Sequence, residues 1–469
     1  MKKNRPLKAA ASLALLLTFA CPIFAKPSIS INSTKDKTSK DKTSEQKQKL
    51  MQKFKQTPET SRIDELKANK EDETMVALKN SKTDSLRKTD VDRYISKVAE
   101  TIDEAASDDF ERVKMIHDII CLTIRYDDDS YWSGDTPSQE SEDVFKSGYA
   151  VCEGFSNAFK SLCDELDITC RVVHGYSRGV SANINNENKT YSSNHAWNIV
   201  TIDGKDYIVD CTWDEGYMKD RESIHEYTTH WLFPNPEHFI YSHYADSAED
   251  QLLPKKVSFS QFLELPSLKP HFFYAVADLQ TNLKLINQCN GSFMIEYVAA
   301  EDQKLTCTIL DIERNEKIQN FTFTQLTEDG KTRILFSLPR AARYNVSFFQ
   351  QDSTMEKSDY CGELILDSKS AGTTVFLETY NNYGLDKNGI LLSPIEGPLE
   401  RGKTYKFSVK SKHSAIEIII DDKWHTMEAE GDGIYSKTIK IPSNAKSLKI
   451  SVDNGTSESY WTLVSYTLK

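Results

Sequence analysis

Hydrophobic side chains recur every three or four positions between residues 90 and 126, with polar residues in the intervals. This period is that of an amphipathic α-helix, so the region is predicted to be helical. Two apolar stripes carry the pattern: Val91, Tyr94, Ile95, Val98 and Ile102, followed by Val113, Ile116, Ile120 and Ile124. His117 falls on the second stripe, which indicates a buried core histidine with hydrogen-bond partners rather than a metal ligand.

Residues 152–166 show the same one-sided pattern and are predicted to form an amphipathic helix that begins at Cys152. The segment before it, residues 127–143, is rich in turn formers and is expected to be a loop. After the helix the pattern changes to strand-like runs. These are residues 168–177, 195–202 and 205–213. Asp203-Gly204 separates the last two runs and predicts a tight hairpin between them.

From about residue 268 onwards, short β-type runs are separated by Gly, Asn and Asp without intervening helical patterns. Strands at this spacing predict two antiparallel sandwiches of roughly 100 residues each. We assign them to residues 267–370 and 371–469, and residues 76–266 to one mixed domain. The predicted fold class is therefore α+β, with an all-β C-terminal half.

The N-terminus places four basic residues among its first eight, followed by an apolar run over residues 9–20. This is typical of a signal peptide, predicted over residues 1–25, and the run is short for a membrane span. A buried core helix is the alternative, but a low-complexity segment follows at once, and residues 26–75 are predicted to be a disordered basic linker. A lipoprotein anchor attached at Cys21 is an alternative to free release, although the bulky Phe19 fits poorly in the motif that precedes a lipidated cysteine. Export to a periplasm or to the extracellular space is expected, with membrane contact only if Cys21 is lipidated.

The charge and the cysteine spacing make two classes of protein less favoured, nucleic-acid binders and zinc ribbons. The formal net charge is -12, but residues 1–55 hold 13 Lys/Arg and 3 Asp/Glu, a balance of +10, so the remainder carries -22. An acidic body disfavours nucleic acid as a partner, because phosphate contacts need clustered cations. The 9 cysteines include no C-x-x-C pair, which disfavours a zinc ribbon and leaves disulfides open.

Cys152 differs from the other cysteines because it stands at a predicted helix start. Unpaired N–H groups and the helix dipole favour a thiolate there, and the same N–H groups can hold an oxyanion. Downstream, the predicted hairpin register makes His195 and Asp210 diagonal neighbours on one face, within reach of a hydrogen bond. A carboxylate in this place can fix the tautomer of an imidazole that serves a nucleophile. The alternative is that His195 and Asp210 are ordinary strand residues.

Three segments carry a resemblance to a known family: GYAVCEGFSNAFKSLCDELDITCRVVHGYSRG, NHAWNIVTIDGKDYIVDCTWDEG and HWLFPNPEHFIYSHYADSAEDQLL. They resemble the transglutaminase-like superfamily, most closely its kyphoscoliosis-peptidase branch. The resemblance implies a papain-like domain followed by immunoglobulin-like sandwiches, with Cys152 as nucleophile, His195 as base and acid, and Asp210 as orienter. It also implies packing roles for the tryptophans at positions 197 and 213, and no organic cofactor. Ala245 and Asp250 depart from the family pattern, which concerns folding more than chemistry.

The side chain that completes an oxyanion hole is not identified by pattern; Trp132 and Gln139, both upstream of Cys152, are the candidates. Four histidines cluster without a compact metal-ligand spacing, so no metal is assigned: His225, His230, His238 and His243. Asp127-Asp128-Asp129 is interpreted as a solvated turn rather than a calcium loop.

Two functions follow from these patterns. The first is an exported cysteine-dependent acyl-transfer enzyme that acts on protein or peptide amides, some of them envelope-associated, either as a peptidase or as a cross-linking transglutaminase. The second is an envelope or surface binding protein that keeps the transglutaminase-like domain as a scaffold, since sandwich domains often serve recognition.

Overall fold

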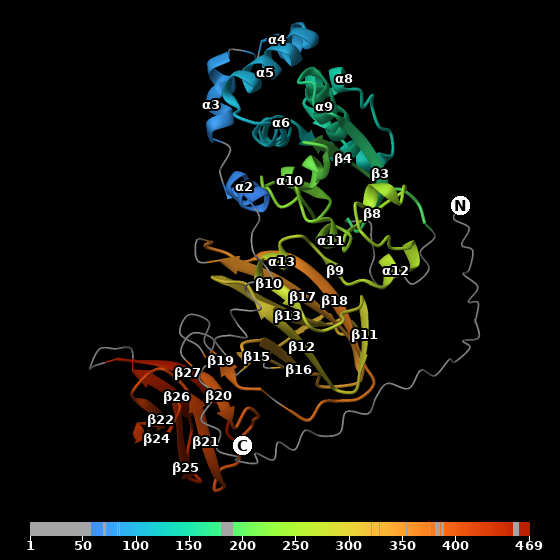
Figure 1. The fold of residues 1–469 in the computed structure, drawn as a ribbon. Coiled ribbons are helices and arrows are strands. Elements are labelled where there is room, and N and C mark those ends of the chain that lie inside the picture. Colours follow the sequence, from blue (N-terminus) through green and yellow to red (C-terminus); the bar gives the residue numbers. More distant parts are fainter. Residues whose placement is uncertain are drawn as a thin grey trace, which may run out of the picture.

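The computed structural model describes residues 58–68, 72–81, 83, 85–179, 191–319, 321–327, 329–352, 355–374, 376–379, 385, 389–453 and 459–469 (Figure 1). The predicted signal peptide, Cys21 and most of the predicted linker lie outside these residues. The predicted disordered linker is wrong in its last part, because Pro58–Ala68 form a helix, a second helix begins at Asp72, and Ile63 packs into the core of the mixed domain. Among the described residues, no helix combines the length and the apolar character needed to cross a membrane.

The N-terminal half is rich in helices, and the two apolar stripes of the sequence form α5 (Val91–Ala105) and α6 (Asp109–Thr123), as predicted. Each helix is started by an aspartate, since Asp90 accepts a hydrogen bond from Arg93 N and Asp108 accepts one from Glu111 N. Shorter helices surround this pair: α2 (Pro58–Ala68), α3 (Asp72–Ser81), α4 (Leu86–Thr89) and α8 (Ser141–Ser147).

The predicted loop over residues 127–143 is wrong in part, because Asp128–Ser133 form helix α7 and α8 begins at Ser141. The side chain of Asp127 accepts a hydrogen bond from Ser130 N and so caps α7. Aspartates that suggest a solvated turn in the sequence therefore start a helix in the fold.

An antiparallel sheet of order β5-β4-β3-β8 forms the centre of this half, and its strands are β5 (Lys205–Val209), β4 (His195–Ile202), β3 (Cys170–Ser177) and β8 (His243–Ala245). Helix α9 (Cys152–Glu165) packs on it, with Phe155, Phe159 and Leu162 in the shared core. The hairpin register is the predicted one, from Ile202 opposite Lys205 to Asn198 opposite Val209.

The strand predicted over residues 205–213 is four residues too long. It ends at Val209, and Cys211–Glu215 form helix α10. The reason is local, because Asp210 accepts a hydrogen bond from Trp213 N and thereby caps this helix.

Small elements complete this half and lead into the first sandwich: β1 (Arg125–Tyr126), β2 (Tyr149–Ala150), β6 (Gly216–Lys219), β7 (Glu222–His225), α11 (Pro236–Phe239), η1 (Glu249–Gln251), α12 (Phe259–Glu264), β9 (Ser267–Leu268) and α13 (Phe272–Ala275). Arg178, buried directly after β3, holds in place the segment that leads into the first sandwich. Its guanidinium donates to the carbonyl oxygens of Tyr241, Phe262, Leu265 and Pro266 at 3.1, 2.6, 2.7 and 2.9 Å. Strand β3 is thus bonded directly to the chain that enters the sandwich.

The first sandwich has sheets of order β10-β12-β16-β15 and β11-β18-β17-β13-β14. Their strands are β10 (Val276–Leu279), β11 (Ile286–Cys289), β12 (Ser292–Ala299), β13 (Gln303–Asp311), β14 (Glu316–Ile318), β15 (Thr322–Leu326), β16 (Thr332–Ser337), β17 (Ala342–Asp352) and β18 (Asp359–Ser368). Side chains from both sheets, including Ile295, Phe336 and Phe348, share one core.

The second sandwich has sheets of order β19-β27-β26-β22-β23 and β20-β21-β25-β24. Its strands are β19 (Glu378–Thr379), β20 (Ile390–Ser393), β21 (Thr404–Lys410), β22 (Ile416–Ile420), β23 (Lys423–Thr426), β24 (Glu428–Gly431), β25 (Ile434–Lys440), β26 (Leu448–Asp453) and β27 (Tyr460–Tyr466). Phe407, Ile418 and Leu463 lie in its core. The predicted α+β fold class, with immunoglobulin-like sandwiches after a mixed domain, is confirmed (Figure 1).

Candidate active site

Cys152 is the first residue of α9 and is half-buried. Two features hold the chain in place before it. The backbone N–H of Val151 donates to Oε1 of Gln139 at 3.0 Å, and β2 just upstream pairs with β1. Gly154 is required in the first turn, since a Cβ there would lie 2.4 Å from Gln139 Oε1 and 2.8 Å from Ala150 Cβ. The thiol is therefore presented from a fixed turn at a helix N-terminus, where N–H groups lack intrahelical acceptors.

His195 and Asp210 are brought together by the β4–β5 hairpin. Nε2 of His195 lies 2.8 Å from Oδ2 of Asp210, and both residues are buried, with exposed fractions of 7% and 1%. Because Nε2 is engaged by the carboxylate, Nδ1 is the nitrogen left to exchange a proton with the thiol. Cys152 lines the same cleft as His195.

The electrostatics favour a cationic His195 beside an ionised Asp210. Burial by itself would lower the pKa of His195, but the charge and hydrogen bond of Asp210, with a smaller contribution from Cys152, raise the pKa to about 10. Burial would likewise raise the pKa of Asp210, yet the adjacent His195 and His243 hold it well below its usual range. An imidazole in this state can stabilise a thiolate at neutral pH.

The site opens into a cleft of about 810 Å³ that both halves of the protein line. The mixed domain supplies Cys152, His195, the aromatic side chains of Tyr126, Tyr131, Trp213 and Tyr217, and several polar groups. The opposite wall comes from the first sandwich, through Phe349 on β17, the turn at Lys357 and Ser358, and Tyr360 on β18. A substrate that reaches the thiol therefore passes along the sandwich.

Neither candidate for the oxyanion hole lines this cleft. The indole N–H of Trp132 donates to the carbonyl oxygen of Arg221 at 3.0 Å, away from Cys152, and Gln139 holds the Val151 backbone instead. Tyr126 does line the cleft, and burial, followed by the charge of Cys152, raises the pKa of its phenol far above the usual range. Its hydroxyl thus stays protonated and can donate. Tyr126 lies on β1, just after the second apolar stripe, and no sequence pattern singled it out.

Two tryptophan rings lie close to His195. The ring centroids of Trp197 and Trp213 lie 6.0 and 5.8 Å from that of His195. His243, which the sequence places among fold residues, also faces the site. Its Nε2 lies 3.2 Å from Oδ2 of Asp210, and its ring centroid is 5.3 Å from that of His195.

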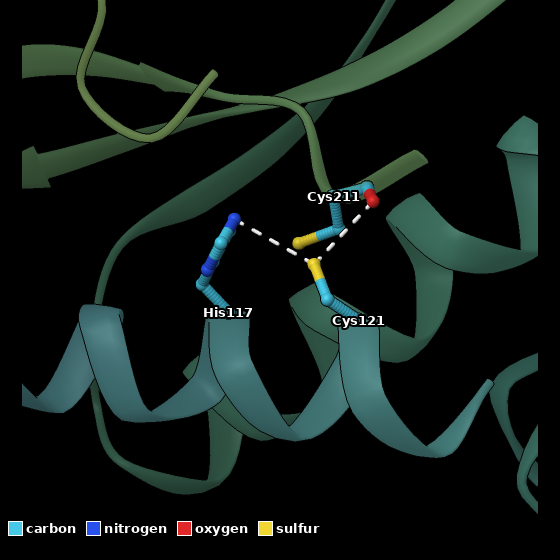
Figure 2. Close-up of side chains that lie close together, drawn as sticks. All are labelled: His117, Cys121 and Cys211. Carbon is cyan, nitrogen blue, oxygen red and sulfur yellow. Dashed lines mark hydrogen bonds between the residues drawn. The ribbon is translucent and has the colours of Figure 1, made fainter. Parts of the chain in front are cut away.

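A second buried polar cluster lies behind α10, where His117 and Cys121 of α6 face Cys211 (Figure 2). His117 is a buried core histidine, with Nδ1 3.2 Å from Asp118 and Nε2 3.0 Å from Asp214. The Cys121 thiol lies 3.6 Å from His117 Nε2 and donates to the Cys211 carbonyl at 3.4 Å. Asp214 also accepts from Trp231 N at 2.9 Å, so this cluster fixes α10, which follows Asp210 directly.

Two groups in the described part of the chain have ligand atoms close enough for one metal ion: His117 with Cys121 and Cys211, and His195 with Asp210 and His243. In both groups the histidine nitrogens already face carboxylates, and burial raises the pKa of Cys121 well above its usual value and that of Cys211 to about 11. A metal would have to displace these protons, so hydrogen bonding accounts for both groups as they stand.

The chain is similar in sequence to known proteins over part of its length. The family model of the transglutaminase-like superfamily matches residues 96–211. Mouse kyphoscoliosis peptidase is 29% identical over 201 residues, which is 42% of this chain and 30% of that protein. Hillarin from Drosophila melanogaster is 27% identical over 218 residues, 41% of this chain and 26% of that protein. The chain thus spans less than a third of the length of these curated relatives.

Among solved structures, a TGase crystal structure is 15% identical with a TM-score of 0.21, covering 39% of this chain and 39% of that one. An I-band fragment of titin is 12% identical with a TM-score of 0.14, covering 42% of this chain and 66% of that one. Scores this low add nothing to the fold that the strand order already gives. The sequence matches mark residues 96–211, which hold the helix-initial cysteine and the hairpin that follows it, as a transglutaminase-like domain, similar in sequence to the kyphoscoliosis peptidases.

Proposed function

We propose that the protein is a cysteine-dependent acyl-transfer enzyme acting on protein or peptide amides. The observation that carries this proposal is the His195–Asp210 pair, 2.8 Å apart and buried, in the same cleft as a half-buried thiol at a helix start. A pure scaffold has no need for a buried ion pair beside an accessible thiol, since replacing such a pair by apolar side chains is often neutral or stabilising.

The chemistry runs through a thioester. Nδ1 of His195 takes the proton of Cys152, and the sulfur attacks the amide carbonyl carbon to form the S–C bond. The carbonyl oxygen becomes an oxyanion, for which the N–H groups at the start of α9 and the Tyr126 hydroxyl are the available donors. The C–N bond then breaks, and the departing amine leaves with the proton held by His195. Water or a second amine resolves the thioester, which gives hydrolysis or cross-linking.

The two-sided cleft favours an extended chain or a long side chain as acyl donor. A small amide would need only the few residues next to the thiol, whereas here Tyr360 and Phe349 of the sandwich continue the wall beyond them. A binding protein that uses this cleft without chemistry is the second candidate, and it predicts an unreactive thiol.

Selective alkylation tests the proposal. Cys289 and Cys307 are half-buried like Cys152 and serve as internal references, because burial raises the pKa of Cys289 and raises that of Cys307 to about 12. With limiting iodoacetamide at pH 6, we expect mass spectrometry to find Cys152 modified at least about a hundredfold faster than either reference. Equal rates at the three thiols would reject the proposal and favour the binding protein.

A second measurement separates the two acyl acceptors. The protein is incubated with a glutamine-containing polypeptide and a fluorescent primary amine. Amine incorporation indicates transfer, and carboxylate formation without incorporation indicates hydrolysis. Cys152→Ala should abolish both, and persistence of either product in that variant would contradict the assignment of the nucleophile.

A further inference from the structure

His243 lies beside Asp210, and the proposed chemistry gives it no role. It lies on β8, the edge strand that pairs with β3 at Ser177. Nε2 of His243 and Nε2 of His195 approach the same carboxylate oxygen, Oδ2 of Asp210, at 3.2 and 2.8 Å. Nε2 of His195 forms a hydrogen bond with this oxygen, whereas Nε2 of His243 lies beside it at ion-pair distance without forming a hydrogen bond of its own. Asp210 therefore lies between two imidazoles.

The surroundings of His243 keep its ring fixed and dry. It is 1% exposed and sits in a box of aromatic rings, stacked on Phe239 with a centroid distance of 4.2 Å and an interplanar angle of 13°. The other walls are the tryptophans Trp197, Trp213 and Trp231 at 5.3, 4.5 and 5.0 Å. The titratable groups that face it, among the described residues, are Asp210 and His195.

Burial decides the protonation state of this ring. Despite the nearby Asp210, burial lowers the pKa of His243 to about 4, so the ring is neutral at neutral pH. A neutral imidazole carries one N–H and one lone pair. The ionised carboxylate favours the proton on Nε2, which leaves a lone pair on Nδ1. The Ser242 hydroxyl lies 2.9 Å from Nδ1 and 3.1 Å from the Phe239 carbonyl oxygen, and in this tautomer its single proton points to Nδ1. His243 can thus hold Oδ2 without neutralising Asp210, and His195 remains the imidazole that takes the charge.

The geometry points to His243 as a positioning residue: a neutral, buried imidazole whose polar Nε2 edge, 3.2 Å from Oδ2 of Asp210, keeps that oxygen in line with Nε2 of His195. This role rests on the proposed function, since it concerns the orienting carboxylate of the same site. His243 does not reach the cleft and is not a catalytic residue in this scheme.

Three variants separate positioning from packing. His243→Phe keeps an aromatic ring in the box but removes the polar Nε2 edge. His243→Gln places an amide nitrogen near the position of Nε2 and can restore that polar edge. Phe239→Leu loosens the same box and leaves the His243 N–H in place. All three are compared with the unaltered chain by thermal unfolding, so that a variant that fails to fold is recognised.

The decisive readout is the titration of His195, followed by imidazole NMR and assigned by loss of the signal in His195→Gln. In His243→Phe we expect the pKa of His195 to fall by about one unit or more, which is a tenfold or greater change in its proton-dissociation constant. The upper limb of the pH profile of Cys152 alkylation should shift down by the same amount. His243→Gln should recover most of both, and Phe239→Leu should change neither. An unchanged His195 titration in His243→Phe, or an equal change in Phe239→Leu, would overturn the positioning role.

The same data distinguish this inference from the proposed function. If Cys152 is not selectively alkylated in the unaltered chain while His195 still responds to His243→Phe, the enzyme proposal fails and the positioning role stands. If Cys152 is selectively alkylated and the pKa of His195 is unchanged in His243→Phe, the enzyme proposal stands and the positioning role fails.

Discussion

At the scale of single residues, the site depends on one carboxylate. Asp210 accepts from His195 through Oδ2 and caps α10 through Oδ1, so the same side chain shapes the backbone and sets the charge of the imidazole. The cap explains why the backbone turns away from the sheet after Val209 while Asp210 still reaches His195.

Replacing Asp210 by asparagine should leave the contact but remove the charge. Burial is then opposed only by the smaller contribution of Cys152, so we expect the pKa of His195 to fall and Cys152 to lose the cation beside it. We expect the alkylation rate of Cys152 at pH 7 to fall by roughly 10² or more, because a wrong tautomer in related triads costs up to about 10⁴ in rate. Asp206→Asn is the matched control on the same hairpin, where Asp206 pairs with Arg171 at 2.8 Å near the surface. Similar losses in both variants would contradict this role of Asp210.

The raised pKa of His195 also predicts how stability varies with pH. A group whose pKa is about 10 in the folded chain and about 6.5 in the unfolded chain stabilises the fold below pH 6.5. That contribution is lost as the pH rises through 10. The unfolding free energy of the chain minus that of His195→Gln, measured by urea denaturation, should therefore be largest near pH 6 and shrink towards pH 10. A difference that grows with pH would show that His195 is neutral in the fold.

At the scale of elements, the close approach of β3 to its neighbours makes the site compact. Gly175 pairs with His195 on one side and Ala245 on the other. A Cβ at this position would lie 2.2 Å from the Tyr244 carbonyl oxygen and 2.6 Å from the Trp197 ring. Only glycine lets β8 come near enough for His243 to face Asp210.

Gly175→Ala is therefore expected to destabilise the domain by about 2 kcal/mol or more, since backbone on one side and a buried ring on the other leave no room. Chemical denaturation measures the loss, and Cys152 alkylation should slow with it. Gly179→Ala is the control, because its Cβ would make only ordinary contacts at 3.7 Å with Ser177 and Trp213. A stability of Gly175→Ala equal to that of the control would mean that β8 moves away easily.

At the scale of the whole molecule, the first sandwich is part of the active-site cleft. Arg178 bonds the end of β3 to the connection between the two units, and Nε2 of His230 lies 3.9 Å from Oδ2 of Asp359 across it. The sandwich can therefore affect which acyl donors reach Cys152 without contacting the thiol.

Tyr360→Ala tests whether the sandwich binds the acyl donor without affecting the reactivity of the thiol. The ring of Tyr360 is 38% exposed, lies 6.0 Å from that of Phe349, and has Lys269 Nζ 5.1 Å above it, so its removal opens the far wall of the cleft. With a polypeptide acyl donor we expect KM to rise about three- to tenfold, for a lost contact of about 1 kcal/mol, with iodoacetamide alkylation unchanged. Trp424→Ala removes an exposed ring from the second sandwich and should leave both unchanged. An unchanged KM in Tyr360→Ala would remove the sandwich from substrate binding.

Local sequence patterns were enough to predict the local features. The apolar period fixed α5, α6 and α9, and Asp203-Gly204 fixed the register that sets His195 near Asp210, because each signal acts within a few residues. Tertiary structure decided the rest. That β8 would bring His243 to Asp210, and that Tyr126 and the sandwich would line the cleft, depends on contacts between segments far apart in the chain. Hydrophobic periodicity states which face of an element is buried, but not which distant element buries it.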